Sequence, residues 1–387
     1  MIALAWSLLA VCLLVLGWTY VGYPAWLLVL ARLKPRPVAP GRWQPRVTVC
    51  MAVHNGMAHL DAKIDGLLAH DYPADRLDLV VVSDGSTDGT GARLRERAGV
   101  RLVAVDAAVR RGKTACLADA VARARGDVLL FTDVRQRLAP GSVQALCDAL
   151  ASGELAAVSG QLRLEDAGGY AQAVDAYWKY ETAIRRAEAA TGSVVGVSGA
   201  LYAVRRQDMP VPPPGLVLDD VWVPMRIAAN GGRIGLEPAA VAYDRASSSA
   251  SVESSRKRRT LSGNWQLLAR WPAITLPGRH PLAWRFIHHK LLRLVAPLFL
   301  VGAFLANALL LGQGALPWML FTAQCAAYGM ALAGLQWPAL RALLPVRLAS
   351  AFLEMNAYAV LGFIDFLRSR DAHLWATAPA AIPPSPP

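Results

Sequence analysis

The sequence predicts an alternating α/β domain with a mainly parallel sheet, combined with helices that cross a membrane. Hydrophobic residues make up 55% of the 387 positions and the mean hydropathy is positive, which is too apolar for an ordinary soluble protein. A block of about 44–263 alternates short apolar runs with helix-like segments. Continuous apolar strands separated by helices are typical of a parallel sheet covered on both faces.

The N-terminal stretch predicts the first membrane helix. Residues 2–31 carry no charge and are long enough to cross a bilayer. A cleaved signal peptide would need a basic start and a shorter apolar core, and neither is present. Arg32, Lys34 and Arg36 follow, which predicts that the downstream side is cytoplasmic. We therefore expect residues 1–35 to anchor a multi-pass protein of the inner (plasma) membrane, with the α/β block in the cytoplasm.

Three further membrane helices are predicted near the C-terminus, at 294–311, 315–335 and 343–367. The last of them contains three polar residues, Glu354, Asn356 and Asp365. Acidic side chains inside a membrane usually face the protein interior or a water-filled path. These residues therefore indicate either helix-packing contacts or a polar path through the membrane.

The basic residues gather beside the apolar stretches. Segment 264–293 mixes aromatic and basic residues, which predicts an amphipathic helix at the membrane surface, and a proline-rich tail covers 368–387. The formal net charge of +12 therefore favours membrane lipids over nucleic acid as partners. The five cysteines form no CxxC pair, so we expect reduced thiols.

Within the block, the expected elements follow one another in a regular order. Strands are expected at 47–53, 77–83, 100–105 and 127–132, and helices at 58–70, from about 88, at 112–125 and at 140–151. Beyond residue 150 the strands are expected at 155–165, 196–206 and 233–238, and the helices at 170–190 and 218–232. The first four strands therefore predict the parallel part of the sheet.

Two of these strands end on an aspartate. LVVVSDG places Asp84 after the second strand, and VLLFTDVR places Asp133 after the fourth. Because ligands bind outside the carboxyl ends of parallel strands, we expect both side chains at one site. An aspartate in this place can also be a turn residue or a helix cap, as we expect for Asp88.

The residue types at this edge limit the chemistry. The turn after the first strand lacks GxGxxG, and no GxxxxGK[ST] occurs, so neither a dinucleotide fold nor a P-loop is supported. Carboxylates need a cation between themselves and phosphates. Asp133 as a ligand of Mg²⁺ or Mn²⁺, with a diphosphate on the same ion, meets that need.

Four segments in order resemble known motifs: VVSDGSTDGT (81–90), RRGKTACLADAVARARGDVLLFTDVR (110–135), LDDVWVPMRIAANGGRIGLEP (218–238) and RKRRTLSG (256–263). Together with the membrane layout, they resemble membrane-integrated family 2 glycosyltransferases, which are related to processive polysaccharide synthases and lipid glycosyltransferases. The resemblance implies a GT-A fold, which is a Rossmann-like, mixed and mainly parallel sheet. Each motif alone is weak, and their order makes the likeness specific.

The resemblance also implies roles for individual residues. The donor would be bound by Val53, His54, Asn55, Asp84, Arg111, Lys113, Asp133, Arg256 and Arg259, of which Asp133 would also bind the metal. Asp220, the second residue of the Asp219–Asp220 pair, would be the general base that deprotonates the acceptor. A neighbouring acid is one physical way to raise the pKa of such a base. Arg256 and Arg259 would stabilise the leaving diphosphate, whose charge grows as the sugar bond breaks.

The sequence departs from the family pattern at several positions. The DxD position reads DVR, so Arg135 replaces the second acid and either leaves Asp133 as a single metal ligand or supplies positive charge itself. In the QxxRW position, Arg256 replaces the glutamine and Thr260 the tryptophan. Trp265 is then the candidate for acceptor binding, or else a bilayer anchor.

These features predict an inverting, hexosyltransferase-type glycosyltransferase. We expect transfer from a nucleotide-diphosphate sugar, with UDP as the expected nucleotide, to a lipid-linked or growing saccharide acceptor in exopolysaccharide or envelope glycan synthesis. One alternative is a processive synthase that couples polymerisation to translocation. Another is an inactive membrane scaffold that binds nucleotide sugars.

Overall fold

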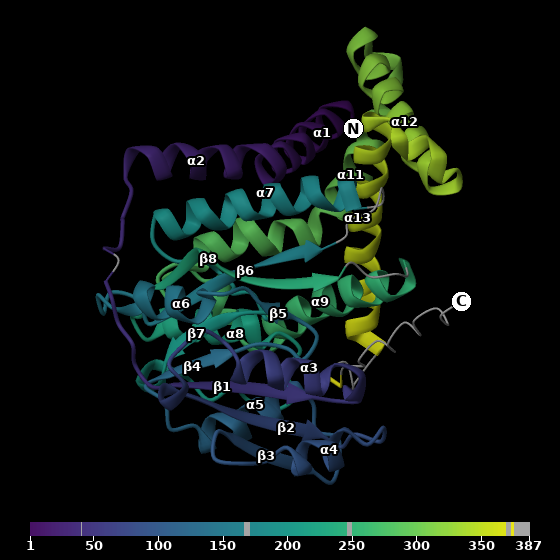
Figure 1. The fold of residues 1–387 in the computed structure, drawn as a ribbon. Coiled ribbons are helices and arrows are strands. Elements are labelled where there is room, and N and C mark those ends of the chain that lie inside the picture. Colours follow the sequence, from purple (N-terminus) through teal and green to yellow (C-terminus); the bar gives the residue numbers. More distant parts are fainter. Residues whose placement is uncertain (40, 166–170, 246–249, 369–372, 375–387) are drawn as a thin grey trace.

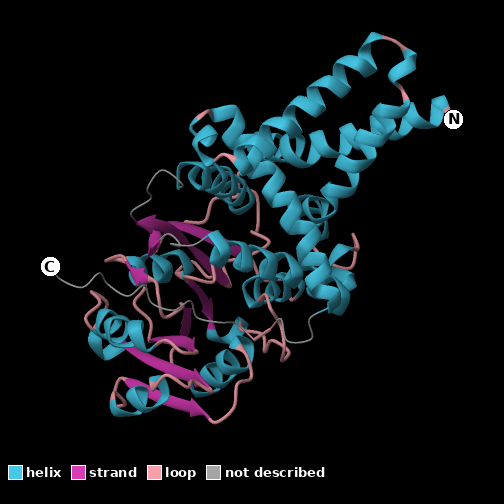
Figure 2. Cartoon of the chain, turned by 90° about the vertical axis from the view of Figure 1, so that its right-hand side faces the viewer, coloured by secondary structure: helices cyan, strands magenta, loops and turns pink. Residues whose placement is uncertain are grey.

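The computed structural model describes residues 1–39, 41–165, 171–245, 250–368 and 373–374, so most of the predicted tail lies outside the described residues. One α/β domain is built on an eight-stranded sheet, and a helical bundle projects from one side of it (Figures 1 and 2). The predicted fold class is therefore confirmed.

The strand order is β3-β2-β1-β4-β7-β6-β8-β5. The strands are β1 Val47–Val53, β2 Leu77–Asp84, β3 Leu102–Ala107, β4 Val128–Phe131, β5 Arg137–Leu138, β6 Ala157–Glu165, β7 Tyr202–Arg205 and β8 Ile234–Arg245. As predicted, β1 to β4 are parallel, whereas β7 runs antiparallel to both β4 and β6. The two-residue strand β5 was not predicted. Strand β8 ends seven residues beyond the predicted end at 238.

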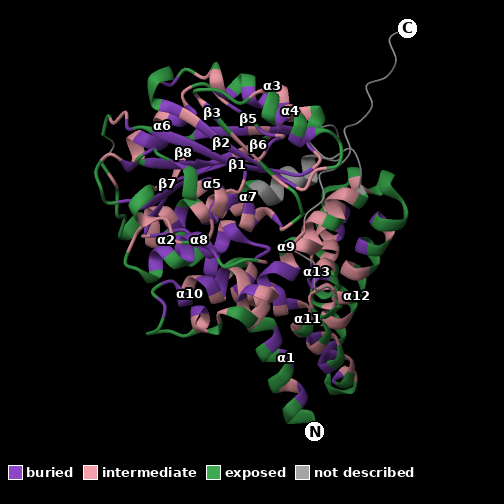
Figure 3. Cartoon of the chain, turned by 90° about the horizontal axis from the view of Figure 1, so that it is seen from below, coloured by how far each residue is buried: buried purple, intermediate pink, exposed green. Residues whose placement is uncertain are grey.

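Successive side chains of a strand point to opposite faces of the sheet. Here both faces carry buried apolar side chains, and helices cover both of them. The helices of the domain are α3 Met57–Leu68, α4 Thr90–Glu96, α5 Lys113–Arg123, α6 Ser142–Leu150, α7 Ala171–Ala190, α8 Asp219–Ala229 and α9 Ala250–Arg270. The odd-numbered residues of β1 pack in a core with α3 and α6, whereas Cys50 and Ala52 pack with α5 and α8 on the other face. The sheet is accordingly the most deeply buried layer (Figure 3).

Among the residues that the structure describes, four helices are long and apolar enough to cross a membrane: Ile2–Leu33, Ala283–Leu309, Ala315–Gln336 (α12) and Leu344–Arg368 (α13). The first consists of α1 Ile2–Gly17, a π-helical turn at Trp18–Gly22 and α2 Tyr23–Leu33. The second joins α10 Ala283–Phe286 through another π-helical turn to α11 Leu292–Leu309. The surface segment expected at 264–293 is therefore not one helix. Its first residues are the last turns of α9, and its last residues belong to the second candidate span.

Helix α13 packs its C-terminal half against α9. Arg258 of α9 donates two hydrogen bonds to Asp365, of 2.9 and 2.6 Å. Glu354 accepts a 2.8 Å hydrogen bond from Arg341, and Asn356 donates to the backbone oxygen of Phe352. The polar residues of this helix thus form intramolecular contacts, and its C-terminal end lies beside the α/β domain.

The domain meets the apolar helices through a buried group of charges. Glu188 of α7 accepts a 3.1 Å hydrogen bond from the Tyr23 hydroxyl and lies 2.9 Å from His289 Nδ1. Glu181 lies 2.8 Å from His289 Nε2 and 2.8 Å from Arg293 Nη1. We call these five residues the interface charge cluster. Burial alone would raise the pKa values of both glutamates, but His289 and the neighbouring cations hold the two pKa values below their ordinary range.

Candidate active site

Asp84 organises the loop that opens α5. Its buried carboxylate accepts hydrogen bonds from the backbone nitrogens of Arg111 at 2.6 Å and Gly112 at 2.9 Å. Gly85 has a φ of 57°, and a Cβ there would lie 2.6 Å from the Arg110 nitrogen. Only glycine allows the two loops to approach this closely. Asp84 therefore shapes the predicted donor site through the backbone of its neighbours.

The predicted base-pocket residues lie beside the same loop. His54 Nδ1 lies 2.8 Å from the Asp84 backbone oxygen. Asn55 has a φ of 49° and accepts a 2.8 Å hydrogen bond from the Thr87 nitrogen. Val53 is the buried last residue of β1. The ends of β1 and β2 therefore form one continuous wall of the site.

Lys113 joins acids from two distant parts of the chain. Its Nζ lies 2.8 Å from Asp133 Oδ1 and 3.9 Å from Asp219 Oδ2. Burial alone would lower the pKa of Lys113, but these carboxylates raise it above the ordinary lysine value. We call Lys113, Asp133, Asp219 and Asp220 the carboxylate rim. The structure thus brings together predicted residues more than 100 positions apart.

Asp220 lies in the first turn of α8. Burial, followed by the charge of Asp219, raises its pKa to about 6. A Cβ added at Gly199 would lie 3.5 Å from Asp220 Oδ2 and 3.7 Å from Lys113 Nζ. Glycine at this position leaves space beside the carboxylate. A carboxyl group with this pKa can accept a proton near neutral pH.

Helix α9 directs two arginines toward the rim. Burial lowers the pKa of Arg259, while Asp219, Asp220 and Asp133 act in the opposite direction, which places their charges close to its guanidinium. Burial and the charge of Arg135 lower the pKa of Arg256. Both arginines remain cations at neutral pH, because an arginine side chain is effectively always protonated. Positive charge therefore faces the acids.

Arg135, which replaces the second acid of the DxD pattern, pairs with a different carboxylate. Its Nη2 lies 2.6 Å from Asp244 Oδ2 at the end of β8. Gln136 donates a 2.9 Å hydrogen bond to the same oxygen. The structure therefore offers no second DxD carboxylate, and the charge of Arg135 is balanced by Asp244.

Lys63, which was not predicted from the sequence, lies beneath Asp133. Its buried Nζ donates hydrogen bonds to Thr132 Oγ1 at 2.9 Å and to the Gln136 backbone oxygen at 2.5 Å. Burial lowers its pKa to about 7, although Asp133 and Asp244 oppose that shift. A lysine on the apolar face of a predicted helix was the available signal.

Two predicted site residues, Arg111 and Trp265, have their side-chain partners outside the carboxylate rim. Arg111 pairs with Asp119 of α5, so its side chain is directed along the helix. Trp265 contacts Phe363 of α13, with ring centroids 4.9 Å apart. This contact makes Trp265 part of the packing between α9 and α13, and the structure does not bring it to the carboxylate rim.

The rim fits a divalent ion only in a restricted way. No group of three or more potential metal ligands occurs among the described residues. Within the same part of the chain, Asp219 Oδ2 is buried without a hydrogen-bond partner, and the Asp133 side chain is 40% exposed. Magnesium is commonly held by one or two carboxylates together with substrate phosphates and water. The rim matches that arrangement.

Comparisons with known proteins show what this chain resembles. Residues 48–208 match the glycosyl transferase family 2 model. A mannosyltransferase from Pyrobaculum calidifontis, solved with GDP-Man and Mn²⁺, is similar at 25% identity and a TM-score of 0.70, over 94% of this chain and 99% of that one. Glucosyl-3-phosphoglycerate synthase from Mycobacterium tuberculosis is 22% identical over 63% of this chain and 82% of that one, with a TM-score of 0.43. No curated protein matches the sequence.

The family match covers β1 to β7, including the strand ends that carry Asp84 and Asp133. The similarity to the mannosyltransferase extends over nearly all of both chains. Among the described residues, four helices are also able to span a membrane. The chain is therefore a glycosyltransferase of the GT-A fold, and its residues 48–208 are the part that matches glycosyl transferase family 2.

Proposed function

We propose that this protein transfers a hexose, with inversion, from a nucleotide-diphosphate sugar to a hydroxyl of a lipid-linked or growing saccharide acceptor. The carboxylate rim is the observation that carries the proposal. It combines an acid whose pKa is raised to about 6 with basic groups on α5 and α9 that can receive a diphosphate. The proposed setting is the cytoplasmic face of the inner membrane, in exopolysaccharide or envelope glycan synthesis.

In the proposed reaction, an Asp220 carboxylate oxygen takes the proton of the acceptor hydroxyl. The acceptor oxygen forms a bond to the anomeric carbon while the bond from that carbon to the diphosphate oxygen breaks on the opposite face. The electron pair of the broken bond stays on the diphosphate. Arg259 and Arg256 stabilise that growing charge, which is the kind of electrostatic contribution that dominates many enzymes. The proton thus moves to Asp220, the sugar moves to the acceptor oxygen, and the nucleotide diphosphate leaves with the electron pair.

Asp133, with Asp219 beside it, would hold the divalent ion. Such an ion, Mn²⁺ or Mg²⁺, supplies neutralisation of the diphosphate charge when it is bound. Lys113 is 2.8 Å from Asp133, and we propose that it binds the diphosphate when the donor enters. The Arg135–Asp244 pair leaves Asp133 as the single carboxylate of the DxD position. The proposed metal requirement therefore rests on Asp133.

The nucleotide is open between two candidates. The family resemblance favours UDP, whereas the mannosyltransferase of similar structure was solved with GDP-Man. His54 and Asn55 line the proposed base pocket, and their side chains contact backbone groups of the neighbouring loop. A donor screen therefore needs sugars of both nucleotides.

Single transfer is favoured over processive synthesis. A polar path for a growing chain was suggested by Glu354, Asn356 and Asp365. In the described structure each of them has an intramolecular partner. These contacts support a packing role, so we place the acceptor at the membrane surface near α9.

The experiment that tests this function measures release of nucleotide diphosphate by the purified protein. The panel contains UDP- and GDP-sugars with native lipid extract as acceptor source, and each donor is assayed with Mn²⁺, Mg²⁺ or EDTA. We expect release from one donor class, dependent on the divalent ion and abolished in Asp220→Asn. Asp75→Asn is the matched control, because it makes the same change on a side chain that is 82% exposed.

Each other outcome has a definite meaning. Release that survives EDTA but not Asp220→Asn would contradict the metal assignment and leave the basic side chains, Lys113, Arg256 and Arg259, as the source of positive charge. Binding of nucleotide without release from any donor would favour an inactive scaffold. Long products from one donor would favour the processive synthase.

A further inference from the structure

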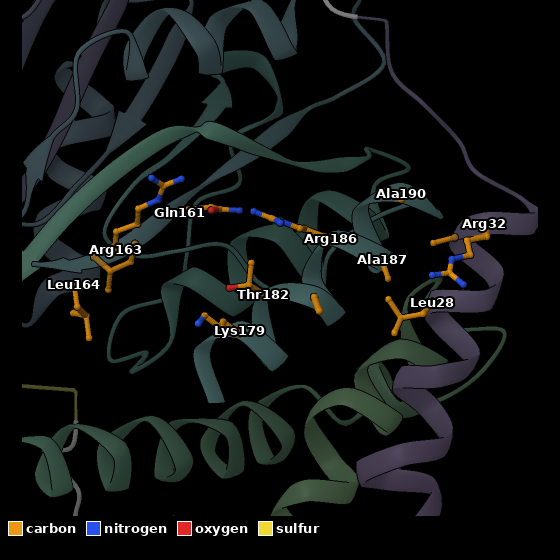
Figure 4. Close-up of a pocket in the computed structure, with 13 residues that line it drawn as sticks. Leu28, Arg32, Gln161, Arg163, Leu164, Lys179, Thr182, Arg186, Ala187 and Ala190 are labelled. Atoms are coloured by element: carbon orange, nitrogen blue, oxygen red, sulfur yellow. The ribbon is translucent and has the colours of Figure 1, made fainter. Parts of the chain in front are cut away.

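A cavity of about 810 Å³ lies between α2, β6 and α7 (Figure 4). None of the proposed donor or catalytic residues lines it. Leu28 of α2 and Ala187 of α7 lie near each other in its apolar wall, and Ala31 of α2 also lines the cavity. Four basic side chains also line it, Arg32, Arg163, Lys179 and Arg186, and no acidic residue is among its described lining. The cavity therefore combines an apolar wall with positive charge.

Two nitrogen donors converge inside this cavity. Gln161 of β6 is only 8% exposed, and its Nε2 has no hydrogen-bond partner among the described residues. Figure 4 shows the Gln161 amide and the Arg186 guanidinium pointing toward each other. An arginine has donors only, so an acceptor between the two groups would satisfy both. A buried donor without a partner costs free energy, and an anion removes that cost.

The position of α7 on β6 is fixed beside this pair. Arg185, the neighbour of Arg186, donates a 2.7 Å hydrogen bond to Ser159 Oγ, two residues before Gln161. The Ser198 nitrogen donates a 2.9 Å hydrogen bond to the same Ser159 oxygen. The Gln161 and Arg186 side chains are therefore presented from elements that are held together.

We propose that this cavity binds the phosphate of an anionic phospholipid from the cytosolic leaflet. Gln161 Nε2 and the Arg186 guanidinium donate to the phosphate oxygens, and an acyl chain lies along Leu28 and Ala31. The apolar wall favours a lipid over a free anion. It belongs to α2, the end of a helix that can span the membrane, so an acyl chain can reach it. Arginine recognises phosphate through two parallel hydrogen bonds. The site lies apart from the proposed donor and catalytic residues, and it rests on the proposed function only for the cytoplasmic orientation.

The test compares lipid retention by the full-length protein in nanodiscs of phosphatidylcholine with or without phosphatidylglycerol. Bound lipid is counted by native mass spectrometry after release from the disc. We expect the wild-type protein to retain phosphatidylglycerol about tenfold over phosphatidylcholine, and Arg186→Ala to lose most of that preference, as expected for one charged hydrogen-bonding partner. Gln161→Leu, which keeps the side-chain size, should reduce the preference for phosphatidylglycerol about threefold.

Arg36→Ala is the matched control, because Arg36 carries the same charge just beyond α2 but does not line the cavity. It should leave the preference unchanged. An equal loss in Arg36→Ala would overturn the proposal in favour of diffuse surface charge. Equal retention of the two lipids would reduce the cavity to an apolar groove. Displacement of the lipid by millimolar inorganic phosphate would identify a free-anion site, and the thermal transition of each variant reports whether it folds.

Discussion

The carboxylate rim and the interface charge cluster both place acids beside basic groups, but they use them in opposite ways. In the interface charge cluster, Glu181 and Glu188 are paired, and their pKa values lie below the ordinary range despite burial. In the rim, Asp220 has a raised pKa, and Asp219 Oδ2 has no hydrogen-bond partner among the described residues, with Lys113 Nζ 3.9 Å away. Paired charges hold the domain to the apolar helices, whereas the rim has a carboxylate oxygen without a hydrogen-bond partner in the described part of the chain, as expected of the proposed binding site.

The strongest test of this difference is Asp220→Asn. General bases contribute about 10²–10⁴-fold to rate, so we expect a loss of that size with nucleotide binding retained. The raised pKa of Asp220 means that the folded protein loses stability as the pH rises from about 4 to about 6. The neutral amide avoids that loss, so the variant should unfold at the same or a higher temperature at pH 7. A large drop in the unfolding temperature would place Asp220 among the structural charges.

Glu188→Gln should have the converse effect. Removing one partner of a buried ion pair costs about 3–5 kcal/mol, and the substitution leaves His289 with Glu181 as its one remaining buried carboxylate. Thermal unfolding in detergent should therefore shift to lower temperature, while the rate per folded molecule at low temperature stays within about twofold, since Glu188 touches no group that acts in the reaction. A selective loss of turnover in a protein of normal stability would contradict the division between the two regions.

Two arginines on α9 compare the regions within one helix. Arg259→Lys keeps the charge but loses the planar fork that suits a diphosphate, so we expect the rate to fall about tenfold. Arg258→Lys alters the contact with Asp365 of α13 and should lower the unfolding temperature with little change in rate. Steady-state kinetics should therefore change mainly in Arg259→Lys, and the unfolding curve mainly in Arg258→Lys.

The smallest expected effect concerns pH. Because the base must be ionised, activity should rise with pH and level off above about 6, where Asp220 has lost its proton. Asp219→Asn removes a neighbouring negative charge and should move this rise to lower pH. The profile of kcat/KM against pH measures the shift. An unchanged midpoint would mean that Asp219 does not influence the base.

The strands and most helix positions could be predicted because apolar runs and helix-like segments are local patterns. Asp84 and Asp133 could be placed at one edge because parallel strands share a direction. The pairing of Arg135 with Asp244 joins residues 109 positions apart, and no local pattern records it. Trp265 was expected to bind the acceptor or to anchor the chain at the bilayer, and its packing against Phe363 was not predicted because that contact with α13 is a tertiary one. Lys63 was missed because burial of a charge is decided by its distant partners.

The attachment of α13 to α9 makes bilayer thickness a variable of the reaction. The helix that carries Arg256 and Arg259 is held by α13, which is long and apolar enough to cross a membrane. A bilayer of different thickness changes the tilt of a membrane-spanning helix at a modest cost per ångström. If α13 spans the bilayer and the two arginines act as proposed, turnover should pass through an optimum as the acyl-chain length of the surrounding membrane is varied.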